Sequence, residues 1–313
     1  MKKSKIIPIS FFVLLIVLFS AFTANNDKKT VDDANSSTEE SQAIEYIKED
    51  NILAVNYFDV GQGDCEFIEL PNDMCMLIDS GEYGNGDEII SKINYLGYDR
   101  IDYVVATHPH SDHIGTMSEI IKEFEIGDIY MHRATSTSST YQYLLETISN
   151  EGLKIHTAKA GKNIYKDDSL SIDILSPSGD DYKDLNNYSA VVKITYDSSS
   201  FLFTGDAESL VEKEMISNSY SMLQSDVLKV GHHGSKYSSS NDFIDAVSPE
   251  YAVISCGSGN TYGHPHEQAL NRIAKSTTDI FRTDKYSDIR FETNGDGTYK
   301  YTLNFFDELT VVE

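Results

Sequence analysis

The sequence has little positive charge, and this shortage excludes a broad class of partners. Lys and Arg number 25 against 50 Asp and Glu, which gives a formal net charge of −25 over 313 residues. Extended binding to nucleic acid or to anionic lipid requires clustered Lys and Arg that neutralise phosphates. The composition therefore excludes a general nucleic-acid binder with a basic groove, although a locally positive site is compatible with it.

Cysteine is also scarce, and its distribution excludes two kinds of stabilising site. The three cysteines, Cys65, Cys75 and Cys256, lie singly inside apolar, strand-like runs. An odd number of separated cysteines indicates neither a disulfide framework nor a cysteine metal cluster. We therefore expect three small, buried side chains.

Long apolar runs are missing from most of the chain, since no stretch after the first residues is long enough to span a bilayer. Residues 1–24 carry three lysines and then an apolar run over residues 6–22. This pattern predicts a signal peptide or a membrane anchor, and residues 25–50 are polar enough to form a flexible linker. We expect one folded domain over residues 51–313, either secreted or anchored through residues 6–22 to the outer face of the cytoplasmic membrane.

The remaining sequence is rich enough in apolar residues for a packed core, because hydrophobic residues make up 40% of the chain. Strand-like runs up to residue 79 are followed by alternating helical and strand patterns to residue 157. The same order is repeated from residue 171 and ends in two strands beyond residue 289. This order predicts two similar halves, each a sheet covered by helices on one side. Packed sheet to sheet, they form an α/β fold, a four-layer αββα sandwich.

Histidines are concentrated in three short segments, which hold seven of the nine in the chain. The first segment follows an apolar strand and contains His108, His110, Asp112 and His113. Such closely spaced imidazoles and a carboxylate form a compact donor set suited to zinc or manganese. The side chains of His108 and His110 project to the same side of an extended segment, while Asp112 and His113 can turn toward a second ion.

Two further strands end in residues of the same kind. Asp206 follows an apolar strand, where a lone Asp is more often a helix N-cap, but a dinuclear site needs a bridging carboxylate that Asp206 can supply. His232 and His233 end another strand. Because adjacent side chains diverge in an extended segment, we expect only one of these two histidines to bind metal and the other to be free for substrate.

The third histidine segment carries His264 and His266 on either side of a proline. We expect it either at the rim of the site, where it would hold a substrate phosphate, or as an ordinary loop before a helix. Lys229 and Ser235 are candidate phosphate contacts, although each is more typical of a structural residue.

Together these motifs resemble metallo-β-lactamase-fold hydrolases, and more narrowly the soluble hydrolase domain of ComEC-type competence proteins. The resemblance extends over residues 53–292 and follows the family's order of motifs. The motifs that carry it are FDVGQGD at 58–64, LIDSG at 77–81, the HxHxDH run at 108–113, NYS at 187–189, TGD at 204–206, GHHGS at 231–235 and NTYGHPH at 260–266.

The resemblance implies a site for one or two ions, Zn²⁺ or Mn²⁺. It assigns His108 and His110 to one ion, Asp112 and His113 to a second ion, and Asp206 to both. His233 or His232 would complete the coordination of an ion. Asp79 and Asn187 would not bind an ion but would lie next to its ligands and orient them. Many family members have a further metal-binding histidine in the region of Asn187 and Ser189. Its absence leaves the first ion with fewer protein ligands.

These observations predict a secreted metal-dependent hydrolase, namely a phosphodiesterase or nuclease that uses a metal-activated water, with Asp112 and His264 taking part in catalysis. The expected substrate is a short nucleic acid or a small phosphodiester, and no protein partner is implied. One alternative is hydrolysis of a lactam or lactone at the same site. A second is a non-catalytic binding module that keeps the fold.

Overall fold

The computed structural model describes residues 46–134, 136–277 and 279–306. The predicted leader over residues 1–24, its apolar run over residues 6–22 and most of the predicted linker lie outside these ranges. Within the described ranges, no helix combines the length and apolar character needed to cross a membrane.

The folded body begins upstream of the predicted boundary at residue 51. The Tyr46 hydroxyl donates a hydrogen bond to Glu69 Oε2 at 3.2 Å, and Lys48 Nζ donates to the Leu70 carbonyl at 2.6 Å. These contacts attach the end of the predicted linker to the first sheet.

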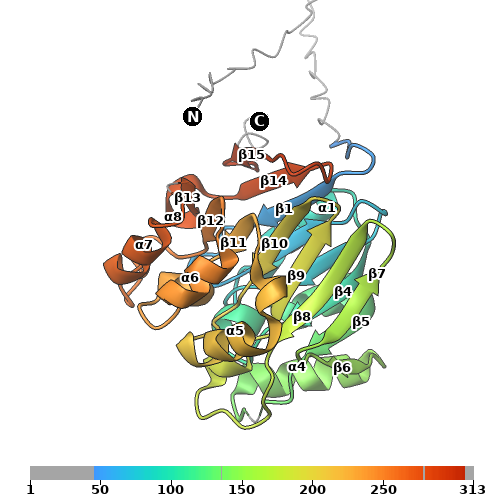
Figure 1. Cartoon of the computed structure of the whole chain (residues 1–313). Coiled ribbons are helices and arrows are strands. Elements are labelled where there is room, and N and C mark those ends of the chain that lie inside the picture. The colour runs from blue at the N-terminus through green and yellow to red at the C-terminus, as the bar shows by residue number, and fades with distance from the viewer. Residues whose placement is uncertain (1–45, 135, 278, 307–313) are drawn as a thin grey trace, which may run out of the picture. The chain divides into compact units, whose positions relative to one another are not determined.

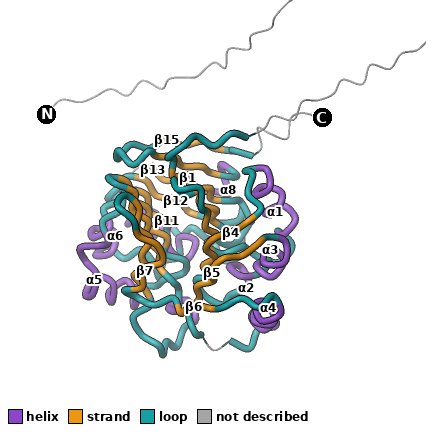
Figure 2. The backbone as a smooth tube through the Cα atoms, turned by 90° about the vertical axis from the view of Figure 1, so that its right-hand side faces the viewer, coloured by secondary structure: helices purple, strands orange, loops and turns teal. Residues whose placement is uncertain are grey.

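Two mixed β-sheets lie face to face, with helices on their outer sides (Figures 1 and 2), which confirms the predicted αββα sandwich. The first sheet contains, in spatial order, β15 (Lys300–Leu303), β14 (Ile289–Thr293), β1 (Leu53–Tyr57), β2 (Glu66–Glu69), β3 (Cys75–Ile78), β4 (Arg100–Ala106), β5 (Glu125–Met131) and β6 (Ile155–Thr157). The second contains β13 (Asp279–Arg282), β12 (Tyr251–Ile254), β11 (Val227–Lys229), β10 (Ser199–Phe203), β9 (Val191–Tyr196), β8 (Leu170–Ser176) and β7 (Lys162–Lys166).

The helices form two groups. Those packed on the first sheet and its strand ends are α1 (Gly86–Tyr95), α2 (Ser111–Ile114), α3 (Met117–Glu123) and α4 (Ser139–Asn150). Those associated with the second sheet are α5 (Ser209–Leu223), α6 (Asn241–Val247), α7 (Glu267–Ile273), α8 (Thr283–Tyr286) and the short 3-10 helices η1 (Leu185–Tyr188) and η2 (Gly231–Gly234). Figure 2 shows α1, α3 and α4 on one side of the sheets and α5 and α6 on the other.

Three apolar clusters hold these layers together. The central cluster lies between the sheets and includes Val55, Ile68, Ile172 and Phe203. One outer cluster packs α1, α3 and α4 on the first sheet, and the other packs α5, α6 and α7 on the second. The cysteines are buried in these layers and are all free, as the sequence predicts. Since burial of apolar area is the main favourable term in folding, the sandwich provides a rigid base for its strand ends.

The last two strands differ from the simple picture of two halves in sequence order. β14 returns to the first sheet and pairs antiparallel with β1, so that Leu53 lies opposite Thr293. The buried Arg290 explains this pairing, because its guanidinium contacts Asn56 Oδ1 at 2.7 Å and also the Glu69 carboxylate on β2. The predicted terminal strands therefore complete the N-terminal sheet.

Candidate metal centre

The polar motifs of the sequence meet where strands of both sheets end. In the first sheet, Asp79 follows β3 and the HxHxDH run follows β4, which is parallel to β3. In the second sheet, Asp206 follows β10, and His232 and His233 follow the parallel strand β11. Because the carboxyl ends of parallel strands lie at one edge of a sheet, these side chains converge at a single place between the two sheets.

Two groups of donor atoms lie at this place, and we number them in chain order as the first and second donor sets. The second donor set consists of Asp112, His113 and His233. Asp206 Oδ1 lies 3.3 Å from His113 Nε2 and 3.5 Å from His233 Nε2, and Asp112 Oδ2 lies 3.4 Å from the same His233 nitrogen. His113 Nε2, His233 Nε2 and Asp206 Oδ1 are buried and have no hydrogen-bond partner among the described residues. Orphaned buried donor atoms that face one point are the arrangement expected of a cation site.

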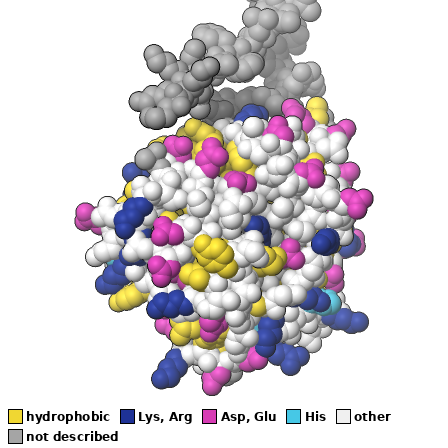
Figure 3. All heavy atoms as spheres, in the orientation of Figure 1, with side chains coloured by type: hydrophobic (Ala, Val, Ile, Leu, Met, Phe, Trp, Pro, Cys, Tyr) yellow, Lys and Arg dark blue, Asp and Glu magenta, His cyan; other side chains and the backbone are white. Residues whose placement is uncertain are grey.

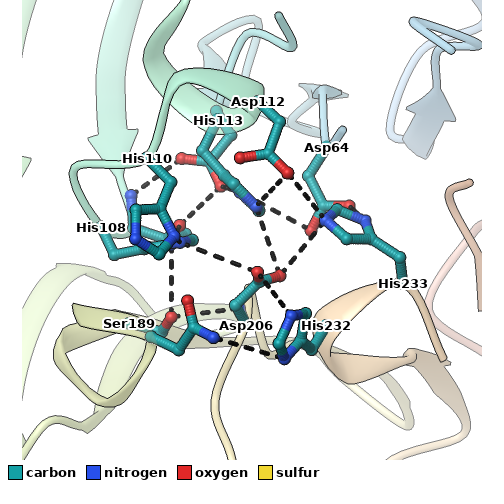
Figure 4. A network of polar contacts seen from close by, with 12 residues as sticks. Asp64, His108, His110, Asp112, His113, Ser189, Asp206, His232 and His233 are labelled. Atoms are coloured by element: carbon teal, nitrogen blue, oxygen red, sulfur yellow. Dashed lines mark hydrogen bonds and ion pairs between the residues drawn. The ribbon is translucent and has the colours of Figure 1, made fainter. Parts of the chain in front are cut away.

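The first donor set consists of His108, His110 and the other oxygen of Asp206. His108 Nε2 lies 3.0 Å from His110 Nδ1 and 3.7 Å from Asp206 Oδ2. Asp206 thus presents one carboxylate oxygen to each set, as Figure 4 shows.

The expectation that His232 and His233 lie in an extended segment is wrong for this backbone. Both residues have left-handed dihedrals, with φ 50° at His232 and 52° at His233, so they form a tight turn rather than an extended segment. His233 Nε2 faces Asp206 Oδ1, and His232 Nε2 lies 3.6 Å from Asp206 Oδ2. His233 therefore belongs to the second donor set. His232 faces the Asp206 oxygen of the first donor set, where the sequence leaves the ion with fewer protein ligands.

Three hydrogen bonds explain how the ring nitrogens are aimed. Asp79 Oδ2 lies 2.7 Å from His113 Nδ1 and also accepts the Thr107 hydroxyl at 2.6 Å. His233 Nδ1 lies 3.0 Å from the Ser255 carbonyl, which can only accept a proton. These contacts fix the Nδ1–H tautomer and leave each Nε2 free for an ion. Asp79 therefore lies behind His113 and orients its ring.

Asn187 and Ser189 take different positions. The Ser189 hydroxyl accepts a hydrogen bond from Asp206 N at 3.0 Å and lies 3.4 Å from His108 Nδ1, so it links two candidate ligands. Asn187 is buried and interacts with Glu208. Among the described residues no hydrogen bond joins its side chain to a proposed ligand, and its neighbour Asn186 instead lies 3.4 Å from His232 Nδ1.

Asp64 is a site residue to which the sequence assigned no role. It is fully buried, accepts a hydrogen bond from Lys229 Nζ at 2.7 Å, and lies 3.1 Å from His233 Nδ1. Gly63 permits this placement, because a Cβ there would meet the Asp112 carbonyl at 2.4 Å. Lys229 is therefore a buried structural partner of Asp64 and is too deep to contact a phosphate. The only sequence signal for Asp64 was its place in the FDVGQGD motif.

Carboxylates dominate the electrostatics of the centre. Burial alone would lower the pKa of His233, but the carboxylates of Asp206 and Asp64 raise it to about 10. Burial alone would raise the pKa of Asp112, yet His113 and His233 beside it lower it to about 2. Protons on the histidines thus balance the carboxylate charge, and a divalent cation can take their place. The residues present therefore fit one or two metal ions.

A cavity of about 310 Å³ opens onto the two donor sets. It is lined by Gln62, His110, Ser111, Asp112, Asn186, Asp206, His232, His233, Tyr262 and His264. The His264 ring lies 5.4 Å from the His232 ring, whereas His266 accepts a hydrogen bond from Lys236 N and does not line the cavity. Of the two rim histidines considered from the sequence, His264 alone reaches the site.

Adding Zn²⁺ or Mn²⁺ to chelator-treated protein is expected to raise the midpoint of thermal unfolding. At an ion concentration 1,000 times Kd the stabilisation is about 4 kcal/mol, or roughly 10 °C for a domain of this size. The shift should be larger at pH 8 than at pH 6, since an ion must displace protons from His113 and His233. Differential scanning calorimetry measures this shift of the midpoint.

His156→Ala removes a histidine outside both donor sets and should keep the full shift. An unchanged midpoint with both ions would contradict the site.

Comparisons with known proteins agree with this geometry. Residues 58–258 match the family model described as the metallo-beta-lactamase superfamily. ComE operon protein 3 of Bacillus subtilis is 30% identical over 78% of this chain and 34% of its own length. Competence protein ComA of Neisseria gonorrhoeae is 31% identical over 82% of this chain and 35% of its own length. The chain thus spans about a third of each relative, and the predicted resemblance to ComEC-type proteins is confirmed.

A solved structure shows the same fold. CmlA, a diiron beta-hydroxylase from Streptomyces venezuelae, superposes with a TM-score of 0.51 at 14% identity, covering 82% of this chain and 55% of that one. The family match and the competence relatives together establish that the chain belongs to the metallo-β-lactamase superfamily.

Proposed function

We propose that the chain is a metal-dependent phosphodiesterase that holds one or two ions, Zn²⁺ or Mn²⁺, between its donor sets. The observation that carries this proposal is the position of Asp206, whose two oxygens face the two sets at the floor of an open cavity. An ion bound there would lower the pKa of a coordinated water toward neutrality and polarise a phosphoryl oxygen. The superfamily fold supports metal-dependent hydrolysis in general.

Asp112 is the candidate proton acceptor. Its Oδ2 points toward His233, while the side chain is 23% exposed and lines the cavity. A carboxylate placed between the donor sets and the substrate space can take a proton from an attacking water and release it to solvent. Burial opposes ionisation, but the adjacent charges of His113 and His233 lower the pKa of Asp112 to about 2, so this carboxylate is ionised at neutral pH.

His264 is suited to hold a phosphate oxygen. Burial and the nearby positive charge of His233 and His232 lower its pKa to about 4, so the imidazole is neutral at physiological pH. A neutral ring can still donate one N–H bond to a phosphoryl oxygen. We therefore assign His264 to substrate orientation and charge stabilisation in the transition state.

Support for a phosphodiester over an amide comes from charge and from the competence proteins among the relatives. Ions held by the donor sets make the cavity locally positive, and the acidic surface beyond about 8 Å is screened at physiological salt. A small anionic ester can therefore reach the centre despite the net charge of −25. We further propose that the protein acts outside the cell or at the outer face of the membrane, as its first residues suggest.

A substrate panel on the metal-loaded full chain tests this function. We expect turnover of bis(p-nitrophenyl) phosphate that EDTA abolishes and Zn²⁺ or Mn²⁺ restores, with little hydrolysis of nitrocefin or of a simple lactone. Cleavage of nitrocefin or the lactone without the phosphodiester would assign the site to ring hydrolysis. Absence of both metal and turnover would leave only a binding module.

A further inference from the structure

Tyr262 is a large side chain at the cavity rim with no role in the functions above. It lies in the loop between β12 and α7, lines the metal-centre cavity, and is 65% exposed. Single exposed apolar groups are common on protein surfaces. Tyr262 differs from the other exposed tyrosines of the described chain because it alone borders this cavity.

The loop that carries Tyr262 is held in place by Asn260. The Asn260 side chain donates to the carbonyls of Gly257 at 2.9 Å and His264 at 2.6 Å, and its Oδ1 accepts His264 N at 3.0 Å. Gly257 also packs directly on the Gln62 backbone, where a Cβ would meet the amide nitrogen at 2.7 Å. The backbone that carries Tyr262 is therefore held in position while the ring stays open to solvent, and an ordered loop lowers the entropy cost of binding a ligand.

The rings at this rim form a series that leads away from the metal centre. The His264 ring lies 5.4 Å from His232, and the Tyr262 ring stacks on His264 at 5.7 Å with an interplanar angle of 20°. A quaternary ammonium group is usually enclosed by several aromatic faces. A single ring backed by a parallel neighbour favours a flat ligand instead.

The acidic composition of the protein makes an uncharged contact, such as ring stacking, useful for binding an anionic ligand. On the face shown in Figure 3, Lys and Arg side chains lie among Asp and Glu side chains. The chain as a whole has half as many basic as acidic residues. Stacking on an aromatic side chain adds affinity for a base without requiring positive charge.

We propose that Tyr262, backed by His264, forms a stacking subsite for a nucleobase or similar planar ring esterified to the phosphate, and so sets the substrate preference of the metal centre. This inference rests on the proposed phosphodiesterase function. It names the part of the substrate that the protein recognises beyond the phosphate.

The chain contains no tryptophan, so Tyr262→Trp introduces a single tryptophan at the subsite, whose fluorescence can be excited at wavelengths that the tyrosines do not absorb. We expect saturable quenching of its fluorescence when thymidine 5′-monophosphate is added to the metal-loaded protein. Ribose 5-phosphate carries the same phosphate and a sugar without the base, and should quench far less. Tyr220→Trp is the matched control, because Tyr220 is 61% exposed on α5 and does not line the cavity.

Three outcomes of the titration would overturn the subsite. They are absence of quenching, equal quenching by ribose 5-phosphate, and quenching by phosphocholine in place of the nucleotide. Equal quenching of the Tyr220→Trp control would show non-specific binding and would overturn it as well. Because this readout needs no turnover, it tests the subsite even if the proposed hydrolysis fails.

Kinetics give the second readout. Tyr262→Ala is expected to lower the ratio of kcat/KM for thymidine 5′-(p-nitrophenyl) phosphate to that for methyl p-nitrophenyl phosphate by about 5- to 150-fold, the range of base stacking. Tyr262→Phe should preserve the ratio, because the phenyl face remains. If both esters are hydrolysed with an unchanged ratio in Tyr262→Ala, the subsite is wrong and the phosphodiesterase proposal stands. Failure to hydrolyse either ester refutes the phosphodiesterase proposal.

Discussion

Asp206→Ala is expected to lose most bound metal and to lower kcat/KM for the phosphodiester on the order of 10³-fold. Removing a group that only supports a ligand typically costs 10- to 100-fold, so a carboxylate shared by both donor sets should cost more. The substitution also removes the carboxylate that lies 3.3 Å from His113 Nε2 and 3.7 Å from His108 Nε2. Elemental analysis of purified protein, together with steady-state kinetics, measures both effects.

A matched control comes from the other end of the same strands. Asp226 precedes β11 and accepts hydrogen bonds from Ser200 N at 2.8 Å and from the Tyr299 hydroxyl at 2.8 Å. Asp226→Asn should lower thermal stability yet keep the metal content and kcat of the folded protein. Wild-type turnover in Asp206→Ala would show that this carboxylate does not bridge the donor sets.

Lys229→Met is expected to destabilise the fold by about 3–5 kcal/mol, because it leaves a buried carboxylate without its partner. Lys229 Nζ lies 2.7 Å from Asp64 Oδ2, and both side chains are 1% exposed. Burial alone would lower the pKa of Lys229, but Asp64 and Glu66 raise it, so the lysine is charged. Burial and the charge of Asp64 raise the pKa of Glu66 itself, which leaves Asp64 as the main ionic partner.

Urea unfolding of metal-free protein measures this effect apart from metal binding. The double variant Asp64→Asn/Lys229→Met should recover part of the loss, since it removes both charges. Lys300→Met is the control, because Lys300 is 75% exposed in its 2.9 Å pair with Glu292 and such surface pairs contribute at most about 1 kcal/mol. A Lys229→Met variant as stable as Lys300→Met would mean that Asp64 is stabilised chiefly by His233.

The fold class and the core of the site follow from local patterns in the sequence. Periodicity identified most strands and helices, and the HxHxDH run placed four donors within one strand end. A short motif of this kind keeps its donor side chains close together in any fold, because the chain has little freedom over six residues. β7 lies between residues 157 and 171, where the sequence shows no strand pattern, since its residues are mostly exposed or partly buried. β13 is equally hard to predict, because it also lacks a continuous buried apolar run.

Other features depend on tertiary structure and left little signal. The turn at His232 and His233 uses left-handed dihedrals that non-glycine residues seldom adopt, so an extended backbone was the natural expectation. Lys229 sits in an apolar strand, and only its pairing with Asp64, far away in the sequence, explains it. Contacts between distant segments cannot be read from spacing alone.

The return of β14 to the first sheet also determines when that sheet can be completed. A chain made from its N-terminus presents β1 long before β14 exists, so the outer edge of β1 remains unpaired while nearly the whole body is synthesised. An open strand edge can pair with other chains. The antiparallel pairing of β14 with β1 then covers this edge, and the ion pair between Arg290 and Glu69 ties β14 to β2 as well, so we expect the C-terminal strands to complete the protection of the sheet from such pairing.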